Sequence, residues 1–170
     1  MKSLAIGIVL VVGVFFWLSG RSTSVTKISE DRATATGPSS TAWKTDYQKA
    51  QEEAKTSHKL VLLNFTGSDW CGWCTQLDRV ILNQQQFKEY ASKNLVLVVI
   101  DFPRRNGPVW KGQSVELKKQ NMELADKFNV EGLPTLVVLS SDGKTVWRYE
   151  GYYSGGLVAF LAELDKVRKG

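Results

Sequence analysis

Two cysteines, Cys71 and Cys74, are the residues of this chain whose type and spacing could do chemistry. They are its only cysteines, and random placement would put two cysteines three positions apart in about one case in a hundred. Their segment, Trp70-Cys71-Gly72-Trp73-Cys74, lies between an apolar run and a helical pattern. Two thiols at this spacing can form a disulfide with each other, exchange electrons with other disulfides, or bind a soft metal ion.

Thiol–disulfide exchange would give the two cysteines different roles. If Cys71 sits at the first turn of the following helix, unpaired backbone N–H groups and the helix dipole stabilise its thiolate, the form that attacks a disulfide. Cys74 lies one helical turn further on, close enough to displace the mixed disulfide that forms first. The pattern therefore predicts Cys71 as the catalytic nucleophile and Cys74 as the catalytic resolver. Trp70 and Trp73 are predicted to cover the sulfurs with apolar surface and to contact a partner chain.

The same two thiols permit other interpretations. A structural disulfide is one, although closing so short a loop constrains little of the unfolded chain. A zinc site is another, but it needs about four ligands and only His58 remains as a further donor. A copper carrier needs only the two thiolates. A binding module that holds client cysteines or a soft metal without turnover is therefore the competing hypothesis to an enzyme.

Apolar patterns on both sides of the cysteines predict the elements that position them. Nearly continuous apolar runs at residues 60–65 and 95–100 predict two strands covered on both faces. Residues 136–139 and 145–149 flank Asp142-Gly143, which predicts a hairpin. Apolar residues at helical spacing predict four helices, marked by Trp43, Tyr47, Ala50 and Ala54 with an end near Ser57, by Leu77, Val80 and Ile81, by Leu117, Met122, Leu124, Ala125 and Phe128, and by Leu157, Phe160, Leu161 and Leu164. This order predicts an α/β fold, a mixed sheet with helices on both faces.

An uncharged apolar stretch, residues 4–20, precedes this pattern and follows Lys2. Its length and basic start are typical of a signal peptide, and it also approaches the shortest helix that crosses a bilayer. Its candidate cleavage sites are poor, which slightly favours a retained anchor. Residues 1–20 are therefore expected to be a signal peptide or membrane anchor, and the rest of the chain is expected to be exported.

The remaining segments are distinguished by composition. Residues 21–41 are rich in Ser and Thr and lack hydrophobic periodicity, which predicts a flexible linker. Residues 42–170 are then expected to form one folded domain. The net charge of +5 is spread among acidic residues, which argues against a nucleic-acid partner. The densest basic patch, Arg104, Arg105 and Lys111 around Trp110, is predicted to be a surface loop, with a basic aromatic contact patch as the alternative.

The cysteine segment and a later proline segment resemble the thioredoxin superfamily, in particular the exported bacterial thioredoxin-like proteins with a W-C-G-W-C motif. The resemblance runs from Trp43 to about Arg168. Its strongest marks are residues 64–74, Asn-Phe-Thr-Gly-Ser-Asp-Trp-Cys-Gly-Trp-Cys, and residues 130–135, Val-Glu-Gly-Leu-Pro-Thr. It implies a thioredoxin fold, with a central mixed β-sheet flanked by helices. It also implies a thiol:disulfide oxidoreductase that reduces or isomerises disulfides in exported proteins.

The resemblance implies a cis peptide between Leu133 and Pro134 beside the cysteines, with a trans proline at a strand start as the alternative. Leu133 would give backbone hydrogen bonds to a substrate strand, and Pro134 would shape the groove and keep metal from the dithiol. Trp70, Gly72 and Trp73 would complete the substrate-binding surface.

Partners and location follow from the same resemblance. The implied partners are protein disulfide substrates and an unidentified redox partner, in the periplasm or cell envelope. The inner membrane is a further contact if residues 4–20 are retained. No cofactor and no metal are expected, because the electrons reside on the sulfurs.

One position departs from the family pattern. Thioredoxins carry a buried carboxylate on the strand before the cysteines, thought to help deprotonate the resolver, where this chain has Asn64. An amide cannot act as a general base, so slow turnover is expected. Asp69 is predicted to be a cap or turn residue, and Asp78 to lie on the solvent side of its helix. The uncharged Gly72-Trp73 pair predicts a reducing-to-intermediate potential.

Overall fold

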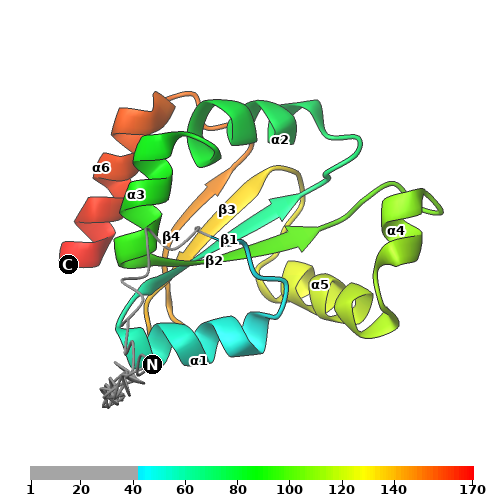
Figure 1. Ribbon diagram of the computed structural model, residues 1–170, viewed down its shortest axis with the longest axis horizontal. Helices are drawn as coiled ribbons and strands as arrows, with labels where there is room; N and C mark the ends of the chain where they lie inside the picture. Colours follow the sequence, from blue (N-terminus) through cyan, green and yellow to red (C-terminus); the bar gives the residue numbers. More distant parts are fainter. Residues whose placement is uncertain (1–41) are drawn as a thin grey trace, which may run out of the picture. The chain divides into compact units, whose positions relative to one another are not determined.

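The structure, a computed structural model, describes residues 42–170, so the predictions for residues 1–20 and 21–41 lie outside it. Its centre is a sheet with the strand order β2-β1-β3-β4 (Figure 1). Strands β1 and β2 are parallel, and β3 is antiparallel to both of its neighbours. The strands are β1 (Leu60–Thr66), β2 (Leu95–Asp101), β3 (Thr135–Leu139) and β4 (Thr145–Glu150). The predicted mixed sheet, with both covered strands and the hairpin, is confirmed.

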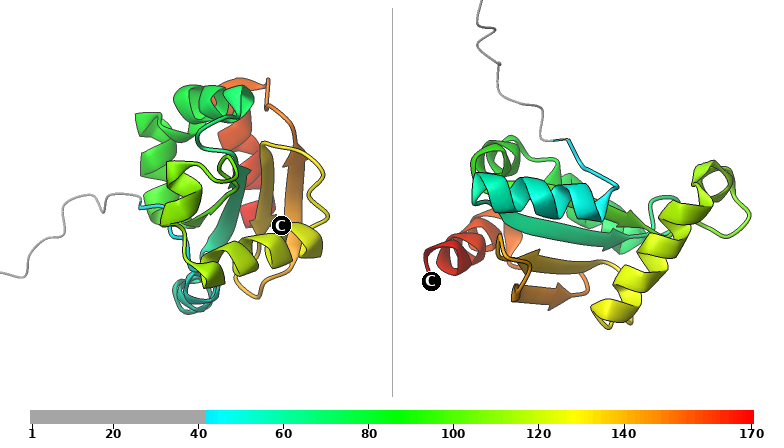
Figure 2. Two further views of the ribbon diagram at one scale, coloured as in Figure 1. Left: turned by 90° about the vertical axis from the view of Figure 1, so that its right-hand side faces the viewer. Right: turned by 90° about the horizontal axis from the view of Figure 1, so that it is seen from below.

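Helices cover both faces of this sheet, as Figures 1 and 2 show. Within residues 42–170 they are α1 (Tyr47–Ser57), α2 (Gly72–Leu77), the π-helical turn η1 (Asp78–Leu82), α3 (Gln85–Asn94), α4 (Pro108–Gly112), α5 (Val115–Lys127) and α6 (Gly156–Lys169). None of the helices in this described range is long and apolar enough to span a bilayer.

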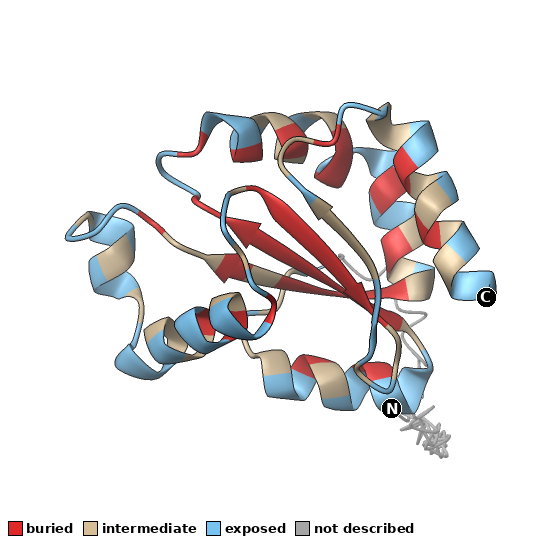
Figure 3. Cartoon of the chain, turned by 180° about the vertical axis from the view of Figure 1, so that it is seen from behind, coloured by how far each residue is buried: buried red, intermediate tan, exposed pale blue. Residues whose placement is uncertain are grey.

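The core has two halves because successive side chains of a strand point to opposite faces. Every residue of β1 is buried, and Leu62 packs with α2, α3 and α6 while Leu63 packs with α1 and α5. Figure 3 shows buried residues concentrated on the central strands and on the helix faces turned toward them. Burial on both faces explains why β1 and β2 are continuous apolar runs rather than alternating ones. The sheet therefore holds the carboxyl end of β1, from which the cysteine loop departs, on a rigid support.

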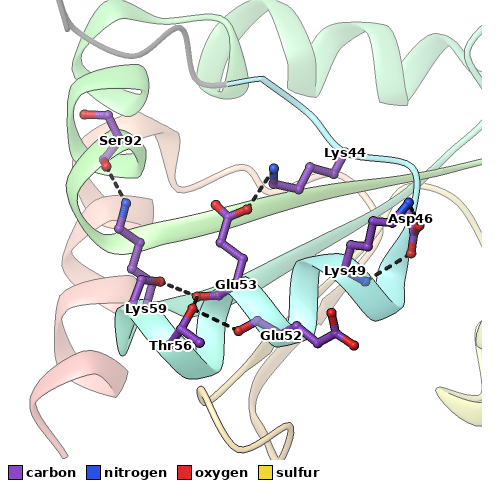
Figure 4. Close-up of polar contacts among 9 residues, drawn as sticks. Lys44, Asp46, Lys49, Glu52, Glu53, Thr56, Lys59 and Ser92 are labelled. Carbon is purple, nitrogen blue, oxygen red and sulfur yellow. Dashed lines mark hydrogen bonds and ion pairs between the residues drawn. The ribbon is translucent and has the colours of Figure 1, made fainter.

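The start of α1 differs from the prediction. Trp43 lies outside the helix, and Lys44 pairs with β2 instead, its N–H donating to Leu97 O at 2.9 Å. The helix begins at Tyr47 because the Asp46 carboxylate accepts a hydrogen bond from Lys49 N at 3.0 Å. Figure 4 shows the Lys49–Asp46 contact and the Lys44–Glu53 ion pair that joins the leading segment to α1. The predicted end at Ser57 is confirmed, and His58 follows as an exposed residue with a left-handed backbone.

Two helices were missed by sequence patterning, α3 and α4. Helix α3 has only Phe87 and Ala91 as buried residues, too few to reveal a period among Gln, Lys and Glu. Helix α4 interrupts the region predicted as a loop, and it starts with Pro108, a residue favoured at the first helical position. Met122 was wrongly placed on the buried side of α5, since 54% of it is exposed.

Candidate functional site

Cys71 stands at the junction between the loop after β1 and helix α2. Its backbone is extended and it caps the helix, because its Sγ atom accepts a hydrogen bond from Cys74 N at 3.2 Å. The predicted position at the first turn is confirmed. Helix N-termini present unpaired N–H groups and a positive dipole end. In the reduced protein the same N–H group would face a Cys71 thiolate, the species that needs such a donor.

The two cysteines form a disulfide, with an S–S distance of 2.06 Å and Cα atoms 5.2 Å apart. Both are buried, Cys71 with 7% and Cys74 with 3% of its surface exposed. The structure is therefore the oxidised form of the pair. In this form Cys71 is slightly more exposed than Cys74, in line with its predicted role as the nucleophile.

The loop that carries the cysteines is tied to the end of β2 by three side chains. Ser68 donates to the Asp101 carboxylate from its N–H at 2.9 Å and from its hydroxyl at 2.7 Å. Asp69 lies in the turn at residues 68–70, as predicted, and its carboxylate accepts from Arg104 N at 2.7 Å. Trp70 Nε1 donates to Phe102 O at 2.7 Å. These contacts fix the approach of the chain to Cys71 by elements distant in sequence.

Gly67 leaves room for the Trp70 ring. A Cβ atom at this position would lie 2.6 Å from Cε2 and 2.7 Å from Nε1 of that ring. We predict that Gly67→Ala displaces the ring, breaks its bond to Phe102, and lowers the free energy of unfolding by about 1–3 kcal/mol. Near-ultraviolet circular dichroism and urea unfolding measure the two effects.

Gly132→Ala is the matched control for this substitution, because nothing lies within 4 Å of a Cβ atom there. Equal urea midpoints for the two alanine variants would show that the close approach of Trp70 to Gly67 carries no stability.

Both tryptophans of the motif expose large apolar surfaces beside the buried disulfide. Trp70 is 51% and Trp73 is 63% exposed. The Trp73 ring packs on Tyr152, with centroids 5.2 Å apart, while the Trp70 ring lies over Gly67. The rings thus rest on neighbouring protein surface and keep a face free toward solvent.

The peptide bond between Leu133 and Pro134 is cis, so the expectation drawn from the resemblance is confirmed. Pro134 directly precedes β3, whose first residue, Thr135, pairs with Phe65 near the end of β1. The proline and the cysteine loop therefore start from the same edge of the sheet. Pro134 O accepts from Gly151 N at 2.8 Å, which holds this turn in place. Among residues 42–170, no hydrogen bond involves the backbone of Leu133.

A pocket of about 650 Å³ lies behind the disulfide, and Cys74, Asn64 and Asp78 are among its lining residues. Asn64 is 4% exposed, and its Oδ1 atom has no hydrogen-bond partner among the residues that the structure describes. Asp78 was wrongly placed on the solvent side of its helix: it is partly buried, and burial raises the pKa of its carboxyl above 3.8. Its spacing of four from Cys74 was the available signal, since residues four apart share a helix face. A larger pocket, of about 740 Å³ between α1 and α5, contains neither cysteine.

The zinc interpretation finds no ligand set in the described part of the chain. Among residues 42–170, no three His, Cys, Asp or Glu side chains are grouped so that they could hold a metal ion. His58 ends α1 and is exposed. Two thiolates alone remain able to bind a soft ion such as Cu(I).

Comparisons with known proteins agree with this site. Residues 47–168 match the family described as Thioredoxin-like domain. The disulfide bond reductase DsbH of Chlamydia pneumoniae is 37% identical over 123 residues, 72% of this chain and 70% of that protein. The thioredoxin-related protein DsbJ of the same organism is 28% identical over 109 residues, 64% of this chain and 30% of that protein. A solved structure of DsbH oxidoreductase is 36% identical, with a TM-score of 0.66, and the match covers 75% of this chain and 84% of that one.

Proposed function

We propose that this chain reduces or isomerises disulfides of exported proteins. The premise is that it belongs to the thioredoxin-like domain family and is a thiol:disulfide oxidoreductase. The observation that carries this proposal is the contact between Cys74 N–H and the Sγ atom of Cys71 at the first turn of α2. This contact gives the attacking sulfur a donor, and the Cys71–Cys74 disulfide shows that the second sulfur reaches the first.

The exchange runs in two steps. The Cys71 thiolate attacks one sulfur of the substrate disulfide, which forms a mixed disulfide and releases the other substrate sulfur as a thiolate. Cys74 then loses its proton and attacks the Cys71 sulfur, which closes the Cys71–Cys74 disulfide and releases the second substrate sulfur. The substrate gains two electrons and the protein loses two. A redox partner that supplies two electrons must then reopen the pair.

The substrate-binding surface is proposed to be the rim around the disulfide. The Leu133 backbone lacks a partner among residues 42–170, so it can pair with an extended substrate segment beside the cis proline, Pro134. Trp70 and Trp73 offer exposed apolar surface on which substrate side chains can pack. Gly72, where an added Cβ atom would meet nothing within 4 Å, leaves the backbone between them open to a partner.

Location and anchoring belong to the same proposal. The apolar stretch at residues 4–20 supports export to the periplasm or cell envelope, either as a cleaved signal or as an anchor in the inner membrane. Residues 21–41 would then be the linker to the domain at 42–170. These segments lie outside the described residues, and their composition is the support.

Insulin reduction by the full chain, recycled with dithiothreitol, tests the enzyme directly. We expect turnover above the dithiothreitol background, and half-oxidation of the pair only at reducing glutathione ratios, because Gly72 and Trp73 add no charge that would favour the thiolate. Half-oxidation at strongly oxidising ratios would contradict the reducing direction.

The second candidate is a carrier that binds a soft metal, such as copper, or client cysteines without turnover. It is favoured by Asn64, which removes the general base expected on β1. No insulin turnover together with stoichiometric Cu(I) uptake would support the carrier over the enzyme.

A further inference from the structure

The pocket behind the disulfide contains a buried amide with an unused acceptor. Asn64 Oδ1 is buried and has no hydrogen-bond partner within residues 42–170, which costs about 1–3 kcal/mol if no water reaches it. The amide belongs to β1 and lines the pocket of about 650 Å³ together with Cys74. This volume is large enough for several waters, and the pocket is lined by further polar groups, among them Thr66 and Thr75.

Asp78 brings a carboxyl group to the same pocket from the helical side. Its backbone N–H donates to Cys74 O, so the two residues are one helical turn apart on one face. Burial raises the pKa of the Asp78 carboxyl and is the sole cause of that shift. A carboxylate whose basicity is raised toward that of a thiol is a better proton acceptor for it.

The other ionisable group that lines the pocket is already engaged. Asp101 accepts two hydrogen bonds from Ser68, at 2.9 and 2.7 Å. In the described part of the chain no Lys, Arg or His lines the pocket. Helices α3 and α6 pack against η1, but none of their charged side chains changes the pKa of Asp78. Asp78 is therefore the carboxylate of this pocket that is free to take a proton.

We propose that Asp78 accepts the proton of the Cys74 thiol through water held at Asn64 Oδ1, in the second step of the exchange. This rests on the proposed function, whose resolving step it completes. The proton passes from Cys74 Sγ to the Asp78 carboxylate, and the resulting thiolate attacks Cys71 Sγ. The Cys71–Cys74 bond forms, the mixed disulfide breaks, and the substrate sulfur leaves as a thiolate. Protonated Asp78 then returns its proton to solvent.

The roles of the two residues in this step follow from their chemistry. An amide oxygen can orient a water but cannot be protonated at these pH values, so Asn64 is a positioning residue. The carboxyl that accepts the proton enters from η1 rather than from β1. The pocket thus keeps a general base although the strand lacks one.

The test is the pH dependence of kcat for insulin reduction by the full chain carrying Asp78→Asn. We expect kcat to fall about tenfold or more at pH 7, with KM unchanged. The loss should shrink as pH rises, because an alkaline solution deprotonates Cys74 without help. Asn64→Asp in the Asp78→Asn background places a carboxylate on the opposite wall of the same pocket and should recover most of the lost kcat. Asp126→Asn, an exposed carboxylate on α5, is the control.

Stability separates this role from a packing role. Because the folded-state pKa of Asp78 is raised above 3.8, the folded chain binds that proton more tightly than the unfolded chain. The carboxyl therefore lowers stability increasingly as pH rises from about 3.8 through the folded pKa. Asp78→Asn should unfold at an equal or higher urea concentration at pH 7, and this advantage should vanish below pH 3.8.

Two results would overturn the proposal while leaving the enzyme assignment intact. One is an Asp78→Asn variant with the wild-type pH profile. The other is an equal loss of kcat at every pH without recovery by Asn64→Asp, which would indicate packing rather than proton transfer. Failure of the enzyme assignment looks different, because wild-type protein itself would then show no turnover.

Discussion

Replacing Cys71 with serine is expected to abolish insulin reduction while leaving the fold intact. A hydroxyl is a far poorer nucleophile than a thiolate toward a disulfide sulfur, so turnover should fall by about three orders of magnitude or more. The fold should survive because serine is a favoured helix-capping residue, and its oxygen can accept the Cys74 N–H bond now made by Sγ. Loss of the short disulfide loop costs little, since closing it constrains few residues. Turbidity of reduced insulin measures the activity.

Urea unfolding of reduced wild type and Cys71→Ser is the control, and their midpoints should agree closely. A variant that retains a tenth or more of wild-type turnover would show that Cys71 is not the attacking sulfur. Serine is preferred to alanine at this position because alanine lacks an oxygen that could cap α2.

Replacing Cys74 with serine is expected to convert the protein into a trap. The first attack by Cys71 still occurs, but the sulfur that should displace the substrate is missing, so the mixed disulfide accumulates. Cys74 is 3% exposed and lies behind Cys71, so substrate should join Cys71 rather than position 74. Non-reducing gels of cells that express the variant should show higher-mass adducts that dithiothreitol removes, and turnover should fall as far as in Cys71→Ser.

Cys71→Ser/Cys74→Ser is the matched control for trapping and should form no adduct. If wild-type protein formed as much adduct as Cys74→Ser, Cys74 would not be the resolving residue. The trapped chains identify the substrates, and their oxidation state reports the direction of electron flow.

The redox motif could be predicted from the sequence because its chemistry is local. Cys71 and Cys74 lie within one helical turn, and the apolar run at 60–65 marks the strand that presents them. The hairpin could be predicted for the same reason, because its turn is formed by the adjacent residues Asp142 and Gly143. Gly143 has a positive φ of 87°. Helix α3 escaped prediction because its contact with the core depends on two residues, whose burial is decided by packing against β2 and α6.

The surroundings of the cysteines could not be predicted in the same way because they are assembled from distant segments. Pro134 reaches the cysteine edge of the sheet because Thr135 pairs with Phe65, a contact between residues seventy positions apart. The cis bond itself was expected from family resemblance, and no local pattern implied it. Trp70 finds its partner in Phe102, beyond β2.

The amino-acid sequence was enough to determine the strands, the cysteine motif and the likeness to thioredoxins. The reason is that an apolar run and the spacing of two cysteines are each contained within a few consecutive residues. Tertiary structure alone decided what surrounds Cys74. On an isolated helix, Asp78 would face water. In the folded chain it is partly buried and lines one pocket with Asn64 and with residues between Asp101 and Leu117, which are distant in sequence. Burial raises the pKa of a carboxyl, and how far a residue is buried depends on which distant segments pack around it in the folded chain.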